Sequence, residues 1–120
     1  MAEVTIYHNP RCSNSRTALG LLEERADDVD LEVVEYLKQP LDRAGLEALL
    51  AILEDAPADL VRHDARFKDL GLDPEGYTTA EAVVDLLVEH PELMQRPVLV
   101  SGGRAVIARP PAEKVPAFLG

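Results

Sequence analysis

Cys12 is the only cysteine of the chain, and its neighbours in the sequence are polar and basic. Residues 3–7 before it are rich in β-branched and aromatic side chains, which indicates a strand. A helix is expected over residues 14–25, because Ser13 and Asn14 are favourable N-cap residues and an apolar stripe follows. A cysteine at a helix start faces unpaired N–H groups and the positive end of the helix dipole, which favour the thiolate. Cys12 is therefore predicted to be a nucleophile.

The surroundings of Cys12 favour this role over the common alternative for a free cysteine, a small buried core residue. Arg11 and Arg16 add positive charge nearby. His8 could orient or deprotonate Cys12 or its bound anion, and a strand-end histidine that bonds only to the backbone is an equal alternative. The backbone N–H groups of Ser15 and Arg16, in the first turn of the helix, could line an anion pocket.

Length, composition and charge restrict the class of protein. A chain of 120 residues that is 47% hydrophobic predicts one soluble domain over residues 1–120. The net charge of −10 disfavours nucleic acid as a partner, because phosphate binding needs a basic surface. The sequence has no apolar run long enough for a membrane span, its first residues lack a secretory signal, and one cysteine allows no internal disulfide. A cytoplasmic monomer is expected.

The hydrophobic pattern predicts strands and helices in the order βαβ, a helical insertion, then ββα. Further strands are expected at 31–36, 96–100 and 105–108, and further helices after Asp42, at 57–62, after Thr79 and at 112–118. A hairpin turn is expected at 101–104. The fold class is thus α/β with a mixed sheet, in the order of the thioredoxin/glutaredoxin fold, enlarged by a helical insertion in the middle.

Other reactive-site patterns fit this sequence poorly. A phosphatase-like Cys-x5-Arg loop would need arginine where Ala18 stands, and Ser15 replaces the second cysteine of a Cys-x-x-Cys motif. The three histidines have no metal-ligand spacing with Cys12, and the chain has no glycine-rich phosphate loop. Neither a bound metal nor a bound nucleotide cofactor is expected.

Several segments besides the cysteine motif form a specific combination. They are Ile6-Tyr7-His8-Asn9-Pro10-Arg11-Cys12-Ser13-Asn14-Ser15-Arg16, Glu35-Tyr36-Leu37, Leu60-Val61-Arg62, Lys68-Asp69-Leu70-Gly71-Leu72, His90-Pro91, Arg96-Pro97 and Ala108-Arg109-Pro110-Pro111. With these segments the chain resembles the ArsC family of glutaredoxin-coupled arsenate reductases, in its short form. The resemblance runs from Val4 to about Val115.

This resemblance implies roles for individual residues. Cys12 matches the cysteine that attacks arsenate, and His8 matches the family's histidine four residues before it. Arg62, Arg96 and Arg109 match the three arginines that hold the oxyanion. The chemistry agrees, because a thiolate that approaches an anion needs fixed cations, and a planar guanidinium suits an oxyanion better than a lysine does.

The sequence context separates these arginines from the others. Arg96 and Arg109 each precede a proline at a strand boundary, where side-chain direction is tightly set. Pro97 is a candidate cis-proline by analogy with thioredoxin-like folds, where such a residue stands opposite the active cysteine. The remaining arginines without such a context, Arg43, Arg66 and Arg104, are expected on the surface.

Because the chain has a single thiol, it cannot supply the electrons for a reduction through an internal disulfide. Reduction of arsenate to arsenite takes two electrons, so an outside thiol must attack the adduct on Cys12 and a second must clear the mixed disulfide. The resemblance implies glutathione as the first thiol, a co-substrate, and glutaredoxin as the second. The sequence does not fix which low-molecular-weight thiol is used.

Two other functions stay open at this point. A thiol-transfer protein of the same fold could act on another substrate, because an arginine pocket beside a thiolate would also hold the carboxylates of glutathione. Spx-type regulators, which bind RNA polymerase, share the fold. Many of them carry a Cys-x-x-Cys switch, which Ser15 removes here.

Overall fold

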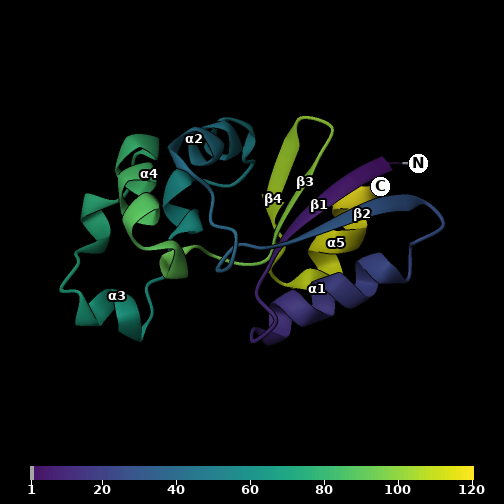
Figure 1. Cartoon of the computed structure of the whole chain (residues 1–120), viewed down its shortest axis with the longest axis horizontal. Helices are drawn as coiled ribbons and strands as arrows, with labels where there is room; N and C mark the ends of the chain where they lie inside the picture. Colours follow the sequence, from purple (N-terminus) through teal and green to yellow (C-terminus); the bar gives the residue numbers. More distant parts are fainter. Residues whose placement is uncertain (1) are drawn as a thin grey trace.

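A four-stranded mixed sheet forms the centre of the computed structural model, which describes residues 2–120 (Figure 1). Its strand order is β2-β1-β3-β4. β1 (Ala2–His8) runs parallel to β2 (Val29–Glu35) and antiparallel to β3 (Val98–Ser101), which pairs with β4 (Arg104–Ile107) in a hairpin. The sheet confirms the predicted mixed α/β fold. Met1, part of the predicted domain of residues 1–120, lies outside the described residues.

Two helices cover one face of the sheet. α1 (Ser13–Glu23) connects β1 to β2, and α5 (Pro111–Leu119) closes the chain beside it (Figure 1). Alternate residues of β1 point to this face, because successive side chains of a strand point to opposite sides. The core here consists mainly of aliphatic side chains: Val4, Ile6, Ala18, Leu22, Val29, Leu99, Val106, Ala108, Val115 and Phe118. This packing fixes the junction between β1 and α1.

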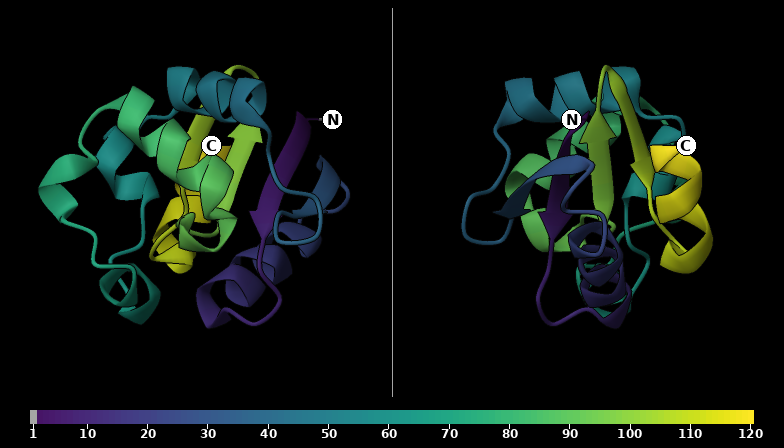
Figure 2. Two further views of the ribbon diagram at one scale, coloured as in Figure 1. Left: turned by 60° about the vertical axis from the view of Figure 1, so that its left-hand side comes forward. Right: turned by 90° about the vertical axis from the view of Figure 1, so that its right-hand side faces the viewer.

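The opposite face is covered by the helical insertion. It consists of α2 (Arg43–Ile52), α3 (Ala65–Asp69), α4 (Ala80–Glu89) and short 3-10 helices at Pro57–Leu60, Pro74–Gly76 and Pro91–Leu93. In the left view of Figure 2, α4 lies in front of the β3–β4 hairpin and α5 behind it. A second core of buried aliphatic and aromatic side chains joins the insertion to the sheet. Within residues 2–120, no helix is long and apolar enough to cross a membrane.

Local signals in the sequence set several element boundaries. Asp42 and Thr79 cap α2 and α4 as predicted, accepting hydrogen bonds from the N–H groups of Gly45 and Ala82 at 2.8 and 3.2 Å. The hairpin turn contains Gly102 and Gly103 at φ of 55° and 77°. Two successive positive φ angles match the twist that a two-residue hairpin turn requires. These boundaries agree with the sequence analysis, whereas α3 was not predicted.

Candidate active site

Cys12 is itself the N-cap residue of α1. Its backbone is extended, with φ −96° and ψ 124°, and its carbonyl oxygen accepts the N–H of Arg16 at 3.0 Å. Its own N–H donates to the carbonyl oxygen of Asn9 at 3.0 Å, which closes the loop after β1. The sequence analysis placed the cap at Ser13 or Asn14, and the helix begins instead at Ser13. The half-buried thiol therefore lies where the free N–H groups of the first turn converge.

The surroundings of Cys12 favour its thiolate. Burial acts to raise the pKa of Cys12, but hydrogen bonds from the backbone N–H of Ser15, the guanidinium of Arg96 and the N–H of Asn14 outweigh it. The net result is a pKa below the ordinary value for a thiol. The main side-chain contribution comes from Arg96, on a distant segment, and not from the neighbouring arginines in the sequence. Arg16 donates instead to the carbonyl oxygen of Pro10, at 3.0 Å.

His8 and Ser15 form a buried pair at the base of the loop. Nδ1 of His8 lies 2.6 Å from Oγ of Ser15, which also accepts the backbone N–H of Asn9 at 3.0 Å. Burial lowers the pKa of His8, which favours the neutral imidazole, whose Nδ1 can accept a hydrogen bond from the Ser15 hydroxyl. The hydrogen bond of His8 is thus made to Ser15 and not to Cys12. Sequence reasoning considered a role on the thiol or a backbone bond, and missed this side-chain pair.

The three arginines singled out by sequence come from three separate segments and meet near Cys12. Nη1 of Arg109 lies 4.0 Å from Sγ of Cys12 and donates to the carbonyl oxygen of Arg96 at 3.0 Å. Arg62 lies close enough to Arg96 and Cys12 for their charges to influence its pKa. Its Nη1 is held by Asp64 at 3.0 Å, and Asp64 also caps α3.

The arginine cluster is left incompletely satisfied. Nε of Arg96 is buried without a hydrogen-bond partner among the described residues. A buried donor without an acceptor costs about 1–3 kcal/mol. Burial lowers the pKa of Arg62, and the charge of Arg96 adds to this effect. An anion between these side chains would accept the free N–H and reduce the repulsion between the guanidinium groups, so the cluster has the chemistry of an oxyanion site.

Tyr36 links the site to the core and was assigned no role from sequence. The residue is 1% exposed, and its hydroxyl donates to the carbonyl oxygen of Met94 at 3.4 Å. Burial raises the pKa of Tyr36, and the nearby side chains of Arg96 and Asn9 act to lower it. Tyr36 therefore connects β2, the cysteine loop and the Arg96 segment. Its signals in the sequence were its place at the end of a predicted strand and the segment Glu35-Tyr36-Leu37 in the family resemblance.

Both prolines that follow site arginines are in cis peptide bonds. The Arg96–Pro97 bond is cis, which confirms the expectation for Pro97, and the Arg109–Pro110 bond is also cis, which was not predicted. The arginines expected on the surface are exposed and ion-paired there: Arg43 with Asp85, Arg66 with Glu92 and Arg104 with Glu54.

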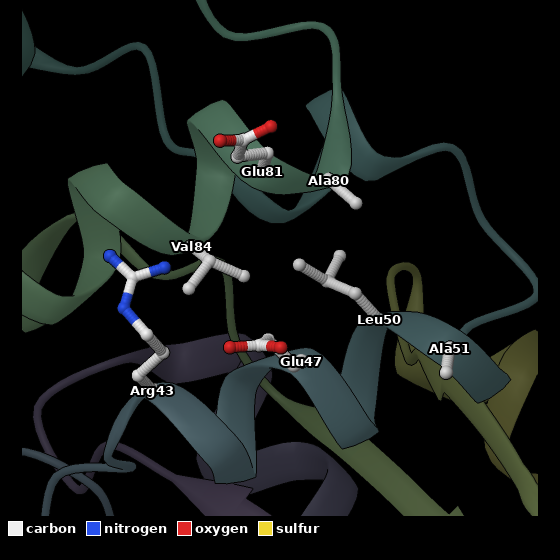
Figure 3. Close-up of a pocket in the computed structure, with 7 residues that line it drawn as sticks. All are labelled: Arg43, Glu47, Leu50, Ala51, Ala80, Glu81 and Val84. Atoms are coloured by element: carbon white, nitrogen blue, oxygen red, sulfur yellow. The ribbon is translucent and has the colours of Figure 1, made fainter.

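A cavity of about 510 Å³ lies away from Cys12 and opens between α2 and α4 (Figure 3). Its lining residues are Arg43, Glu47, Leu50, Ala51, Ala80, Glu81 and Val84. This groove contains no nucleophile and shares no side chain with the cysteine site. The candidate active site is therefore placed at the Cys12 loop, because of its reactive groups, and not at this cavity.

Comparison with known proteins agrees with the cysteine loop and the arginine segments. A sequence model of the ArsC family matches residues 7–116. The chain belongs to the ArsC family. The matched range contains Cys12 and all three arginines near it. Family membership accounts for the mixed sheet with its helical insertion, which is the thioredoxin-like fold of ArsC structures.

Individual relatives match nearly the whole length of this chain. It is 43% identical over 113 residues to an uncharacterized protein, YfgD, of Escherichia coli K12, covering 92% of each chain. It is 41% identical over 112 residues to an arsenate reductase of Neisseria meningitidis serogroup B, covering 92% of this chain and 93% of the other. The solved structure of an arsenate reductase from Vibrio cholerae superposes with a TM-score of 0.81 at 32% identity, covering 96% and 97% of the two chains.

Proposed function

We propose that this ArsC protein is an arsenate reductase that works through an adduct on Cys12. The observation that carries the proposal is the meeting of guanidinium groups from three segments around a thiol with a lowered pKa. The unpaired Nε of Arg96 supports an anionic ligand in particular. Relatives named arsenate reductase at about 40% identity support arsenate as that anion.

In the first step, the Cys12 thiolate attacks the arsenic atom of arsenate held by Arg62, Arg96 and Arg109. A sulfur–arsenic bond forms, and an arsenate hydroxyl leaves as water after it takes one proton from solvent. The guanidinium groups offset the repulsion between two anions and donate to the oxygens on which charge develops. The backbone N–H groups of Ser15 and Arg16 extend the same positive environment at the start of α1.

In the second step, a glutathione thiolate attacks Sγ of Cys12. The sulfur–arsenic bond breaks, its electron pair stays on arsenic, and arsenite leaves. Cys12 remains as a mixed disulfide with glutathione. A glutaredoxin thiolate then attacks the glutathione sulfur and releases the Cys12 thiolate. Each turnover thus converts one arsenate and two thiols into arsenite, a disulfide and water. With one cysteine in the chain, both reducing thiols must come from outside.

His8 and Ser15 act on the loop in this account, and not on the reacting atoms. Their short hydrogen bond, together with the bond from Asn9 to Ser15, holds the segment whose N–H groups point at Cys12. Every group named comes from one copy of the chain, so we infer that a monomer is sufficient. Because Cys12 must be reduced between turnovers, we also infer a reducing compartment such as the cytoplasm.

The test is arsenate-dependent oxidation of NADPH, coupled through glutathione reductase, with glutathione and glutaredoxin present. Wild type is compared with Cys12→Ser and with a control at the neighbouring exposed position, Ser13→Ala. We expect turnover in wild type and in the control, and none in Cys12→Ser or when either thiol is left out. Turnover by Cys12→Ser would overturn the proposal. Lack of turnover with rapid glutathionylation of Cys12 would favour a thiol-transfer role, and an unreactive Cys12 would favour a binding role.

A further inference from the structure

A second cavity, of about 290 Å³, opens beside the cysteine site and shares Arg109 with it. Its lining residues come from the segment after α2, the loop before β3, the end of β4, the β4–α5 loop and α5: Asp55, Asp59, Gln95, Ile107, Arg109 and Lys114. Since Nη1 of Arg109 lies 4.0 Å from Sγ of Cys12, a single side chain separates this cavity from the reactive sulfur. The groove of Figure 3 has no such connection.

The cavity carries charges of both signs. The carboxylate of Asp55 is fixed by the N–H of Ile107, which donates to its Oδ2 at 2.8 Å. Asp59 and Lys114 are exposed, and no ion pair within residues 2–120 involves either side chain. The lining therefore contains two carboxylates, Asp55 and Asp59, and two cations, Arg109 and Lys114. A simple anion would meet the carboxylates, and a simple cation would meet the arginine and lysine.

The ligand that matches this pattern carries an ammonium and a carboxylate together, as the α-amino acid end of a small molecule does. We propose that the cavity binds the α-amino acid end of the low-molecular-weight thiol that attacks Cys12. The γ-glutamyl end of glutathione has this chemistry. The aspartates accept hydrogen bonds from its ammonium, and Lys114 and Arg109 donate to its carboxylate. The inference rests on the proposed function, because it assigns a binding position to that reaction's thiol.

The size and place of the cavity agree with such a ligand. Its volume of about 290 Å³ is close to the lower end of the usual range for ligand sites, which leaves room for one end of a tripeptide. A tripeptide is about 10 Å long when extended, which is enough to leave its central thiol beyond Arg109 while the terminal group is bound. The cavity would then direct the attacking sulfur toward Cys12, and arsenate would occupy the other side of Arg109.

The test measures how fast Cys12 forms a mixed disulfide in the absence of arsenate. The Cys12 thiolate attacks glutathione disulfide, which yields the glutathionylated protein and one glutathione thiolate. The same rate is measured with 2-hydroxyethyl disulfide, which lacks an amino acid end.

The variant is the double substitution Asp59→Asn with Lys114→Gln, which leaves the net charge unchanged. The matched control is Asp69→Asn with Lys68→Gln, two exposed residues of α3. Circular dichroism checks the fold of each protein.

We expect wild type and the control to prefer glutathione disulfide, and the cavity variant to lose about tenfold of that preference, as expected for about 1.4 kcal/mol of lost binding. N-acetylation of the glutathione disulfide should have a similar effect on wild type, because it removes the ammonium. An unchanged preference in the cavity variant would overturn the inference, and so would an equal loss in the control. If arsenate is not reduced but the preference depends on Asp59 and Lys114, the proposed function fails and the subsite remains.

Discussion

Arg109 connects Cys12 to the backbone of Arg96. Its Nη1 lies 4.0 Å from Sγ of Cys12 and donates to the carbonyl oxygen of Arg96 at 3.0 Å. Arg96 in turn acts to lower the pKa of the Cys12 thiol. The two Arg-Pro segments, one before β3 and one after β4, lie side by side at the open end of the hairpin, and this contact holds them together at the sulfur. The guanidinium of Arg109 is therefore hydrogen-bonded to the backbone of Arg96 before any anion binds.

Replacement of Arg109 by lysine is expected to reduce kcat/KM for arsenate about 10- to 100-fold. A lysine keeps the charge but provides a point donor, so it cannot bond to the Arg96 carbonyl and to an oxyanion with one planar group. Steady-state kinetics of Arg109→Lys, with Arg104→Lys as the control, measures this effect. Arg104 is paired with Glu54 on the surface, and its variant should stay within about twofold of wild type. Equal losses in both variants would argue against a role of Arg109 in the site.

The reactivity of Cys12 should depend on Arg96. Its positive charge and hydrogen bond lower the pKa of the thiol, so neutral glutamine at this position should raise that pKa. The thiolate then forms at higher pH, and alkylation of Arg96→Gln by iodoacetamide at neutral pH should be slower than in wild type. The pH profile of the alkylation rate measures the shift. Arg11→Gln, which changes an exposed arginine beside Cys12 in the sequence, is the control and should move the profile less.

Removal of the Ser15 hydroxyl should destabilise the protein. Ser15 is fully buried, and its oxygen pairs with both Nδ1 of His8 and the N–H of Asn9. Ser15→Ala leaves those two buried groups without partners, at a cost of about 1–3 kcal/mol in the free energy of unfolding. Urea denaturation measures it. Ser13→Ala, at an exposed position on the same turn, should change stability by no more than about 0.5 kcal/mol, and a similar loss in both variants would contradict the structure.

Tyr36 is expected to be a positioning residue for Arg96. Tyr36→Phe keeps the ring in the core but removes the hydroxyl that bonds to Met94 and lies near Asn9 and Arg96. We expect a loss of about 1 kcal/mol in stability and a rise in KM for arsenate that exceeds any fall in kcat. Tyr77→Phe is the control, since Tyr77 packs edge-on against Phe67 in the insertion. A change in stability with unaltered arsenate kinetics would limit Tyr36 to a structural role.

The sequence predicted the features of the fold that local signals determine. The β-branched and aromatic residues of β1, the caps Asp42 and Thr79 and the Gly102–Gly103 turn each have a short-range physical cause. The short helix α3 lacked such a signal, because five residues are too few to show a helical period. Its importance is local to the site, because Asp64 at its start holds Arg62.

The site was predicted as a set of residues and not as a set of contacts. Cys12 and the arginines could be named because their types and neighbours are unusual in the sequence. The partners of His8, Arg96 and Arg109 could not, since they depend on long-range packing between β1, the insertion and the β3–β4 hairpin. The same reason explains why the cavity shared by Arg109 and Lys114 had no counterpart in the sequence pattern.

A single turnover without glutaredoxin tests the central claim most directly. Wild-type protein is mixed with arsenate and glutathione, quenched, and analysed for arsenite and for the mass of the Cys12 peptide. The account predicts one equivalent of arsenite per protein, formed together with one glutathione on Cys12 and absent without arsenate. Arsenite that forms while Cys12 stays unmodified, or glutathionylation that proceeds at the same rate without arsenate and yields no arsenite, would contradict it.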